Sequence, residues 1–283
     1  MTSGIFAAGD RVRLQDDKGR MVSFTLKAGD TFHTHKGWIH HDDLIGKSDG
    51  SIIETNSGMK YQAFSPLYPD FVLGMPRGAT IIYPKDAAMI IGFGDIRSGQ
   101  KIIEAGAGSG ALSIALLKTL GDTGELHSFE AREDFWAIAK KNVAAFFGHE
   151  PKNWNLNNLR LEEADPLQLA GCDRIVLDML APWEHVAFAG ETLRPGGLLI
   201  VYVATTTQLS RVAEVIKADG RFTEPESFET LLRNWHHEGL AVRPAHSMNA
   251  HTGFLTLARR NAGVTLERRR RPAKGAYSED FSV

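Results

Sequence analysis

Three carboxylates close apolar segments at points where a sheet could use them in chemistry. Glu104 ends Lys-Ile-Ile-Glu, Glu130 ends His-Ser-Phe-Glu and Asp178 ends Ile-Val-Leu-Asp. Apolar segments of this length are typical of buried parallel strands. Open α/β sheets bind ligands outside the carboxyl ends of their strands, so each side chain is a candidate for a ligand site.

A glycine-rich turn follows the first of these segments. Gly106, Gly108 and Gly110 separate a predicted strand from a predicted helix, and glycine lets a backbone turn tightly and approach a ligand. The dinucleotide fingerprint would need a further glycine where this chain has Ala111. An acid before the first glycine instead suits a positive ligand, and S-adenosylmethionine carries an ammonium and a sulfonium but no pyrophosphate. The turn therefore resembles the first motif of class I methyltransferases more than that of NAD-dependent oxidoreductases.

Two further acids extend the expected cofactor site. Glu130 could accept hydrogen bonds from both ribose hydroxyls, and Asp165 follows the third predicted strand, where such folds contact the adenine amino group. The alternative for Glu130 is an ordinary strand-end acid, and for Asp165 an acid that caps a turn. The residues expected to bind the cofactor are Glu104, Gly106, Gly108, Ser109, Gly110, Glu130, Asp165 and Asp178.

The elements that must position these residues alternate along the chain. Strands are expected at 101–105, 125–130, near 159–161, 174–178, 198–203, near 227–232 and 253–258. Helices are expected at 84–90, 111–120, 134–147, 184–193 and 209–218. Repeated strand–helix alternation predicts an α/β fold, a doubly wound Rossmann-like domain with a mostly parallel sheet.

The first 75 residues have a different pattern. Between turn-forming stretches lie short segments with partial alternation, at 11–15, 21–26 and 51–55. They predict a small β domain, too short and polar to hold a large core, which should dock on its neighbour. We therefore predict an N-terminal β domain over 1–75, a catalytic domain over 76–260 and a polar, basic, mobile tail over 261–283.

Composition limits the class of protein. The chain has 283 residues, 43% of them hydrophobic, a formal net charge of -2 and one cysteine, Cys172. It holds no apolar run of the roughly 18 residues that a membrane span needs and no signal-peptide pattern. One cysteine forms no intrachain disulfide, so a cytoplasmic protein fits best, with Cys172 in the core. The slightly negative charge argues weakly against a purely electrostatic nucleic-acid binder.

Five motifs occur together, in the order His33-Thr-His-Lys-Gly, Tyr83-Pro-Lys-Asp, Glu104-Ala-Gly-Ala-Gly-Ser-Gly, Glu130-Ala-Arg and Leu177-Asp-Met-Leu-Ala-Pro-Trp. The combination resembles the tRNA (adenine-58-N1)-methyltransferase family in its prokaryotic, homotetrameric form, over residues 5 to 260. The resemblance implies a class I S-adenosylmethionine-dependent enzyme that modifies adenosine 58 in the T-loop of tRNA and assembles as a homotetramer. It also implies Asp178 as the catalytic aspartate and Tyr83 as the motif tyrosine. The chain departs from the family at Thr206, where Asn is common, so the contacts of that loop stay open.

The implied reaction gives these two residues distinct roles. The N1 lone pair of adenine can attack the sulfonium methyl in line with the departing sulfur, after which the ring is cationic. We expect Asp178 to accept a hydrogen bond, or a proton, from N6 and Tyr83 to position the base. Pro84 favours an extended backbone at Tyr83. A structural or helix-capping aspartate and an interface tyrosine are the alternatives.

Position 58 lies inside the folded T-arm, so the base must be flipped out and the phosphates around it held. Candidate phosphate contacts are Lys36, Arg77, Lys85 and the four arginines at 268–271. Ordinary solvated surface charge is the alternative for each of them. The arginine cluster is the expected nonspecific RNA contact.

The histidines at 33, 35, 40 and 41 suggest a metal site. Methyl transfer from a sulfonium needs no metal, and no cysteine joins these residues. We therefore expect no metal, and histidines that face RNA or an interface. His251 should either line the cleft or form hydrogen bonds at the start of a strand.

Three other functions are compatible with part of this set of motifs. A class I methyltransferase with a protein or small-molecule acceptor is disfavoured by the segments at 83–86 and 178–183. An NAD-dependent oxidoreductase is disfavoured by the spacing of the glycines. A noncatalytic RNA-binding module with a relic cofactor fold is disfavoured by the intact turn together with Asp178.

Overall fold

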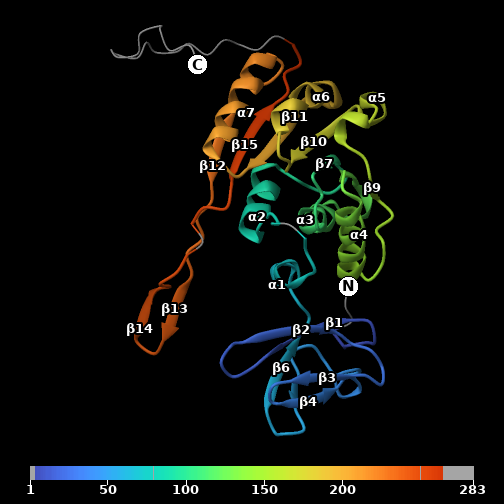
Figure 1. The fold of residues 1–283 in the computed structure, drawn as a ribbon, viewed down its shortest axis with the longest axis vertical. Helices are drawn as coiled ribbons and strands as arrows, with labels where there is room; N and C mark the ends of the chain where they lie inside the picture. Colours follow the sequence, from blue (N-terminus) through green and yellow to red (C-terminus); the bar gives the residue numbers. More distant parts are fainter. Residues whose placement is uncertain (1–3, 79, 249, 264–283) are drawn as a thin grey trace.

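The computed structural model describes residues 4–78, 80–248 and 250–263, and Figure 1 shows two bodies joined through a short helix. The larger body is built on a seven-stranded sheet in the order β12-β15-β11-β10-β7-β8-β9. Its strands are β7 (Lys101–Ala105), β8 (Glu125–Phe129), β9 (Trp154–Asn157), β10 (Cys172–Leu177), β11 (Leu193–Val203), β12 (Glu226–Glu229) and β15 (Phe254–Arg259). The strands from β11 to β9 are parallel, and β15 is antiparallel to β11 and β12. The predicted α/β class with a mostly parallel sheet is confirmed.

Helices cover both faces of this sheet, because successive strand residues point to opposite sides. Ile102 of β7 packs with α2 (Pro84–Phe93), α3 (Ala111–Leu120) and α4 (Glu133–Phe147). Ile103 packs on the other face with α5 (Pro166–Leu169), α6 (Val186–Thr192) and α7 (Thr206–Asp219). Cys172 is buried in this second cluster, as expected of a core residue. The short 3₁₀ helices are η1 (His41–Asp43), η2 (Gly121–Thr123), η3 (Leu161–Glu163) and η4 (Pro182–His185).

The N-terminal body is built of strands, as predicted, and all their pairings are antiparallel. Its main sheet has the order β2-β1-β6-β5 and consists of β1 (Arg11–Gln15), β2 (Met21–Thr25), β5 (Ile52–Glu54) and β6 (Lys60–Phe64). A hairpin of β3 (Thr31–Thr34) and β4 (Gly37–His40) packs beside it. Despite the polar composition, the body has an apolar cluster of its own, around Val12, Leu14, Leu26, Ile39 and Tyr61.

Helix α1 (Tyr68–Gly74) connects the two bodies. Arg13 of β1 forms a 2.6 Å ion pair with Asp70, and Arg11 Nη2 donates to the carbonyl of Gly74 at 3.4 Å. On its other side α1 buries Phe71 and Val72 in the core of the larger body. The N-terminal body therefore contacts α1, which itself packs on the α/β sheet. The division at residue 75 stays a prediction.

The third strand of the sheet lies earlier than predicted. The strand expected near 159–161 is wrong, because β9 spans Trp154–Asn157 and Leu161 begins η3. Asparagine is depleted in strands, so Trp-Asn-Leu-Asn is a poor match to strand propensity. Trp154 is nevertheless buried in the core, and its indole donates to Ser128 Oγ at 2.9 Å. Packing against β8 overrides propensity at this edge.

A hairpin that sequence analysis did not predict leaves the sheet between β12 and β15. Its strands are β13 (Trp235–Glu238) and β14 (Ala241–Pro244), and Figure 1 shows it extending away from the α/β body. The strand expected near 227–232 is consequently shorter and ends at Glu229. None of the helices among the described residues is long and apolar enough to cross a membrane.

Candidate active site

The turn after β7 has the backbone geometry that its glycines allow. Gly106, Gly108 and Gly110 have φ values of +88°, +54° and +83°, a region that L side chains rarely adopt. A Cβ on Gly106 would in addition overlap the backbone carbonyl of Asp178. The Gly106 and Ala107 amides donate to the carbonyl of Phe129, and the Asp178 amide donates to the carbonyl of Ala105. The turn is thus held by the ends of β8 and β10.

Three carboxylates meet around this turn, as the strand-end pattern suggested. Glu104 lies on β7, and Glu130 and Asp178 directly follow the neighbouring strands β8 and β10. Burial, followed by the charges of Glu104 and Glu130, raises the pKa of Asp178 to about 7. Burial and then the charge of Glu130 also raise the pKa of Glu104 to about 7, against two serine hydrogen bonds that lower it. The site therefore disfavours further negative charge and favours a cation.

Glu104 lies beneath the turn and is 1% exposed. Its Oε2 accepts hydrogen bonds from Ser113 Oγ at 2.7 Å and Ser128 Oγ at 2.5 Å. Its Oε1 is buried and has no hydrogen-bond partner among the described residues. A ligand can reach this carboxyl group only through Oε1 or through its charge.

Glu130 organises the turn from the side of β8. Its Oε2 accepts from the Gly108 amide at 2.8 Å, and its Oε1 accepts from the Arg132 amide at 3.0 Å. The Arg132 guanidinium lies 3.5 Å from the centre of the Phe135 ring, which keeps it beside this carboxylate. Oε1 also lies 3.4 Å from Arg132 Nε, so Oε2 is the oxygen that keeps a lone pair for a further donor such as a ribose hydroxyl.

These features fit S-adenosylmethionine and not a dinucleotide. Two positive charges would be stabilised by the clustered carboxylates, whereas a pyrophosphate would be repelled by them. Ser109 Oγ, on the turn itself, is buried and unpaired within the described chain, so it can still bond a ligand. Asp178, Glu130, Gly106, Gly108 and Ser109 are the residues that would surround the methyl donor.

Asp165 is exposed and caps α5. Its Oδ1 accepts from the Leu167 amide at 2.9 Å, which is the turn-capping role given above as the alternative. Oδ2 has no hydrogen bond among the described residues, so a contact with adenine stays a prediction.

Tyr83 stands at the first turn of α2 and carries an extended backbone, with φ −66° and ψ 152°, as Pro84 predicts. It lines an open cavity of about 420 Å³ together with Arg77, Gly78, Thr80 and Ile81. Asn142 Nδ2 donates both to the carbonyl of Pro76 and to that of Ser109, at 2.8 and 2.9 Å. This amide ties the segment that leads to Tyr83 onto the glycine turn.

Comparison with known proteins agrees with this geometry. Residues 4–53 match the TrmI-like N-terminal family model, and residues 69–240 match the model of the tRNA methyltransferase complex GCD14 subunit. The tRNA (adenine(58)-N(1))-methyltransferase TrmI of Thermus thermophilus is 33% identical over 247 residues, which cover 87% of this chain and 95% of that protein. The chain belongs to the tRNA (adenine-58-N1)-methyltransferase family. A Methanocaldococcus jannaschii relative named tRNA (adenine(57)-N(1)/adenine(58)-N(1))-methyltransferase TrmI is 28% identical over 269 residues, covering 87% of this chain and 93% of that protein.

Solved structures support the same assignment of fold. The tRNA (m1A58) methyltransferase TrmI of Aquifex aeolicus has a TM-score of 0.78 at 27% identity, covering 90% of this chain and 98% of that one. A structure described as a SAM-dependent O-methyltransferase of Thermotoga maritima has a TM-score of 0.86 at 27% identity, covering 96% and 98%. This chain therefore has the fold of class I S-adenosylmethionine-dependent methyltransferases.

The basic residues expected to contact tRNA fall into three groups. Arg77 is exposed at the cavity beside Tyr83, and Lys36 is half-buried in the N-terminal body. The arginines at 268–271 lie outside the described residues. Lys85 is not a surface charge: it is buried and pairs with Asp86 at 2.7 Å, so its expected phosphate contact is wrong. Lys85 also donates to the carbonyl of Thr230 and to Thr252 Oγ1, and these distant partners explain the burial.

Tyr202 on β11 is a residue of the site that sequence analysis missed. Its hydroxyl donates to Asp86 at 3.4 Å, and burial raises its pKa, with Asp86 and Asp178 among the nearby charges. It lies inside a predicted apolar strand, where the sequence gives no sign that its hydroxyl contacts a distant carboxylate. Downstream, Thr206 begins α7, whose cap Thr205 bonds Gln208, and Gln208 Nε2 donates to the carbonyl of Leu180 at 3.1 Å. The loop after β11 is thereby tied to the segment that follows Asp178.

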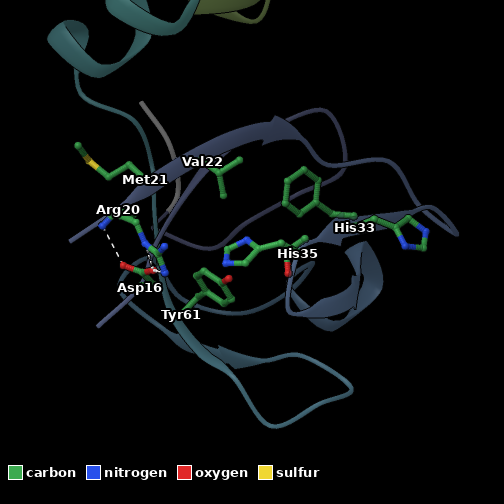
Figure 2. Close-up of a pocket in the computed structure, with 9 residues that line it drawn as sticks. Asp16, Arg20, Met21, Val22, His33, His35 and Tyr61 are labelled. Carbon is green, nitrogen blue, oxygen red and sulfur yellow. Dashed lines mark hydrogen bonds and ion pairs between the residues drawn. The ribbon is translucent and has the colours of Figure 1, made fainter. Parts of the chain in front are cut away.

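The N-terminal histidines are divided between core and surface. His41 is buried, accepts from the Lys27 amide at 2.9 Å and packs on Phe24. His33 and His35 are exposed and line a small open cavity, about 220 Å³, where Figure 2 shows the His35 ring pointing toward Arg20 and Tyr61. No cluster of three metal-ligating side chains occurs in the part of the chain that the structure describes.

His251 has a hydrogen-bonding role at the start of β15. Its Nε2 lies 2.8 Å from the carbonyl of Ala204, and its Nδ1 lies 2.9 Å from Glu229 Oε2. The carbonyl and then the carboxylate raise the pKa of this imidazole. It joins the ends of β11 and β12, so the expected hydrogen bonding at the start of a strand is confirmed, and a place in the cleft stays a prediction.

Proposed function

We propose that this protein methylates N1 of adenosine 58 in the T-loop of tRNA, with S-adenosylmethionine as the methyl donor. The observation that carries the proposal is the meeting of Glu104, Glu130 and Asp178 around the Gly106 turn, in a chain of this family. The donor supplies a methyl group made electrophilic by its sulfonium. The side chains position the two reactants and stabilise the positive charge that develops on the adenine ring.

On the donor side, the chain offers fixed acceptors for hydroxyl and ammonium groups. Glu130 keeps a lone pair on Oε2 for a ribose hydroxyl beyond its bond to the Gly108 amide, while Arg132 occupies Oε1. Glu104 favours the positive end through its charge and its unpaired Oε1. Asp165 presents Oδ2 to the adenine amino group while Oδ1 caps α5. Ser109 Oγ is a buried hydroxyl on the turn itself that no described residue bonds.

On the acceptor side, Asp178 accepts a hydrogen bond from N6 of the target adenine and so aligns N1 with the methyl group. A partly buried carboxylate is most effective where positive charge develops, because the low dielectric strengthens the interaction. Tyr83 positions the base from the open cavity that it lines with Arg77. The base must be flipped out of the T-arm, and Arg77, exposed beside Tyr83, is the best-placed candidate to hold a neighbouring phosphate.

We further propose a homotetramer in the cytoplasm. The β13–β14 hairpin and the segment that leads into it expose large apolar side chains that no described part of this chain covers: Leu231, Leu232, Trp235, Leu240 and Val242. Exposed apolar surface of this kind is typical of protein interfaces. A cytoplasmic location suits a tRNA substrate and a chain with one cysteine.

The test is transfer of a labelled methyl group from S-adenosylmethionine to an unmodified tRNA transcript, followed by nuclease digestion and mass spectrometry. 1-Methyladenosine at position 58 is the expected product, and additional product at 57 would place the protein with the Methanocaldococcus relative. Asp178→Asn should lower kcat by about 10²-fold or more with unchanged tRNA affinity. Donor binding without transfer to any tRNA would overturn the proposed acceptor and point to a protein or small molecule.

A further inference from the structure

A buried ion pair joins three parts of the chain beside the site. Lys85 and Asp86 are adjacent on α2, and their side chains are 8% and 1% exposed. Lys85 Nζ donates to Asp86 Oδ1 at 2.7 Å, to the carbonyl of Thr230 at 2.7 Å and to Thr252 Oγ1 at 2.5 Å. The ammonium has three protons and three acceptors, so its hydrogen bonding is complete.

The partners of this pair lie at both ends of the protruding segment. Thr230 directly follows β12 and Thr252 lies two residues before β15. The Lys85 ammonium group therefore binds both ends of the segment that carries the β13–β14 hairpin. Asp86 Oδ2 accepts from the same Thr252 hydroxyl at 2.6 Å and from Tyr202 at 3.4 Å. Thr252 therefore closes the network between the lysine and the aspartate.

The same network borders the acceptor side of the proposed site. Tyr83 precedes Lys85 by two residues at the start of α2, so the anchoring of Lys85 also anchors Tyr83. The ring of Tyr202 packs directly on the backbone of Gly253, where a Cβ would overlap it. Asp178 is among the charges that act on Tyr202. Both tyrosines thus depend on the junction that holds the hairpin.

We propose that Lys85, Asp86 and Thr252 are positioning residues, which set Tyr83 and Tyr202 relative to Asp178 and couple the placement of the β13–β14 hairpin to methyl transfer. The proposal rests on the proposed function. A buried ion pair is a weak source of stability, because desolvation offsets its attraction. A fully satisfied network does fix one arrangement of its members, and misplacement of reacting groups by about 1 Å can lower a rate 10²-fold.

The sharpest test removes one hydroxyl from the assembled, full-length protein. Thr252→Val keeps the shape of the side chain but deprives Lys85 of an acceptor and Asp86 of a donor. It should lower kcat for tRNA about tenfold or more, with the dissociation constant for S-adenosylmethionine within about twofold of wild type. Thr252→Ser restores the hydroxyl and should restore kcat. Thr256→Val is the matched control, since it removes a buried hydroxyl of β15 whose one side-chain partner among the described residues is Ser227, at 2.9 Å.

The outcomes separate positioning from general damage. Unchanged kcat in Thr252→Val would overturn the proposal, as would an equal loss of kcat in Thr256→Val or a parallel loss of donor binding. If wild-type protein methylates no tRNA, the proposed function fails, and hydrogen exchange then tests the junction by itself. Thr252→Val should speed exchange at 83–90 and across the hairpin, whereas Thr252→Ser and Thr256→Val should leave both segments unchanged. Unchanged exchange in Thr252→Val would show that the Thr252 hydroxyl does not hold α2 and the hairpin in place.

Discussion

The backbone carbonyl of Asp178 lies where a Cβ of Gly106 would stand. The residue that opens the glycine turn and the residue that carries the proposed catalytic carboxylate are therefore in direct backbone contact. The Asp178 amide is fixed as well, by the carbonyl of Ala105 at 2.9 Å. Donor turn and acceptor carboxylate cannot move independently, which is what in-line methyl transfer requires.

Gly106→Ala should abolish binding of S-adenosylmethionine and lower stability more than Gly99→Ala does. Gly99 has a similar φ of +82°, but a Cβ there would meet only Thr123 Oγ1 at 3.8 Å. The control variant thus carries the left-handed backbone strain alone, about 1–2 kcal/mol. Thermal unfolding and calorimetric titration with the donor measure the difference. Equal behaviour of the two variants would mean that the Asp178 contact does not constrain the turn.

The pH dependence of the reaction should show an acid limb due to Asp178. Burial, Glu104 and Glu130 raise its pKa to about 7, and only the ionised form carries the negative charge that stabilises the cationic ring. kcat/KM for the donor, which reports the free enzyme, should therefore fall as pH drops through about 7. In kcat the midpoint should move to lower pH, because the bound cation favours the carboxylate. The residual activity of Asp178→Asn should lack this limb; a limb that persists in the variant would assign it to another group.

Glu104→Gln should make stability less dependent on pH. The pKa of Glu104 is raised to about 7 by burial, so the folded protein keeps this proton while the unfolded chain releases it near pH 4.5. The contribution of this proton to the free energy of unfolding is fully present below about pH 4.5 and is lost as pH rises through about 7. The glutamine variant lacks that loss, so its Tm should exceed the wild-type value at pH 8 and approach it at pH 4.5. A constant difference across this range would contradict the raised pKa.

The strand-end carboxylates and the glycine turn were predictable because their determinants are local. β7 and α3 have the predicted bounds, since an apolar strand, three glycines and an apolar helix follow one another without interruption. Wherever a carboxylate ends such a strand, topology alone brings it to the ligand edge of the sheet. Glu130 and Asp178 were placed correctly for this reason.

What could not be predicted depends on contacts between distant segments. Lys85 has the composition of a surface residue, and its burial follows only from Thr230 and Thr252, which lie far away in sequence. Tyr202 similarly gains its place in the site through Asp86. β9 was misplaced because Trp-Asn-Leu-Asn is a poor match to strand propensity, and the contact that buries Trp154 against Ser128 joins segments that are distant in sequence. Hydrophobic period and turn chemistry carry no information on such pairs.

The β13–β14 hairpin has one apolar and one polar face. Trp235 pairs with Pro244 and His237 with Val242, so these side chains share a face, which is exposed. On the other face His236 bonds Glu238 at 3.1 Å. An isolated two-stranded hairpin is marginally stable in water, and within the described chain nothing covers its apolar face. A second copy of the chain would supply that cover.

Trp235→Asp should therefore reduce the assembly to a smaller species. A carboxylate on the apolar face would be buried without a partner in the interface, a penalty large enough to dissociate most complexes. Light scattering coupled to size-exclusion chromatography measures the mass directly, and the wild type should behave as four chains. Leu167→Asp is the control, because Leu167 on α5 is 84% exposed but lies outside the hairpin. If Trp235→Asp kept the wild-type mass, the hairpin would not form the interface, and its apolar face would be left for tRNA or another partner to cover.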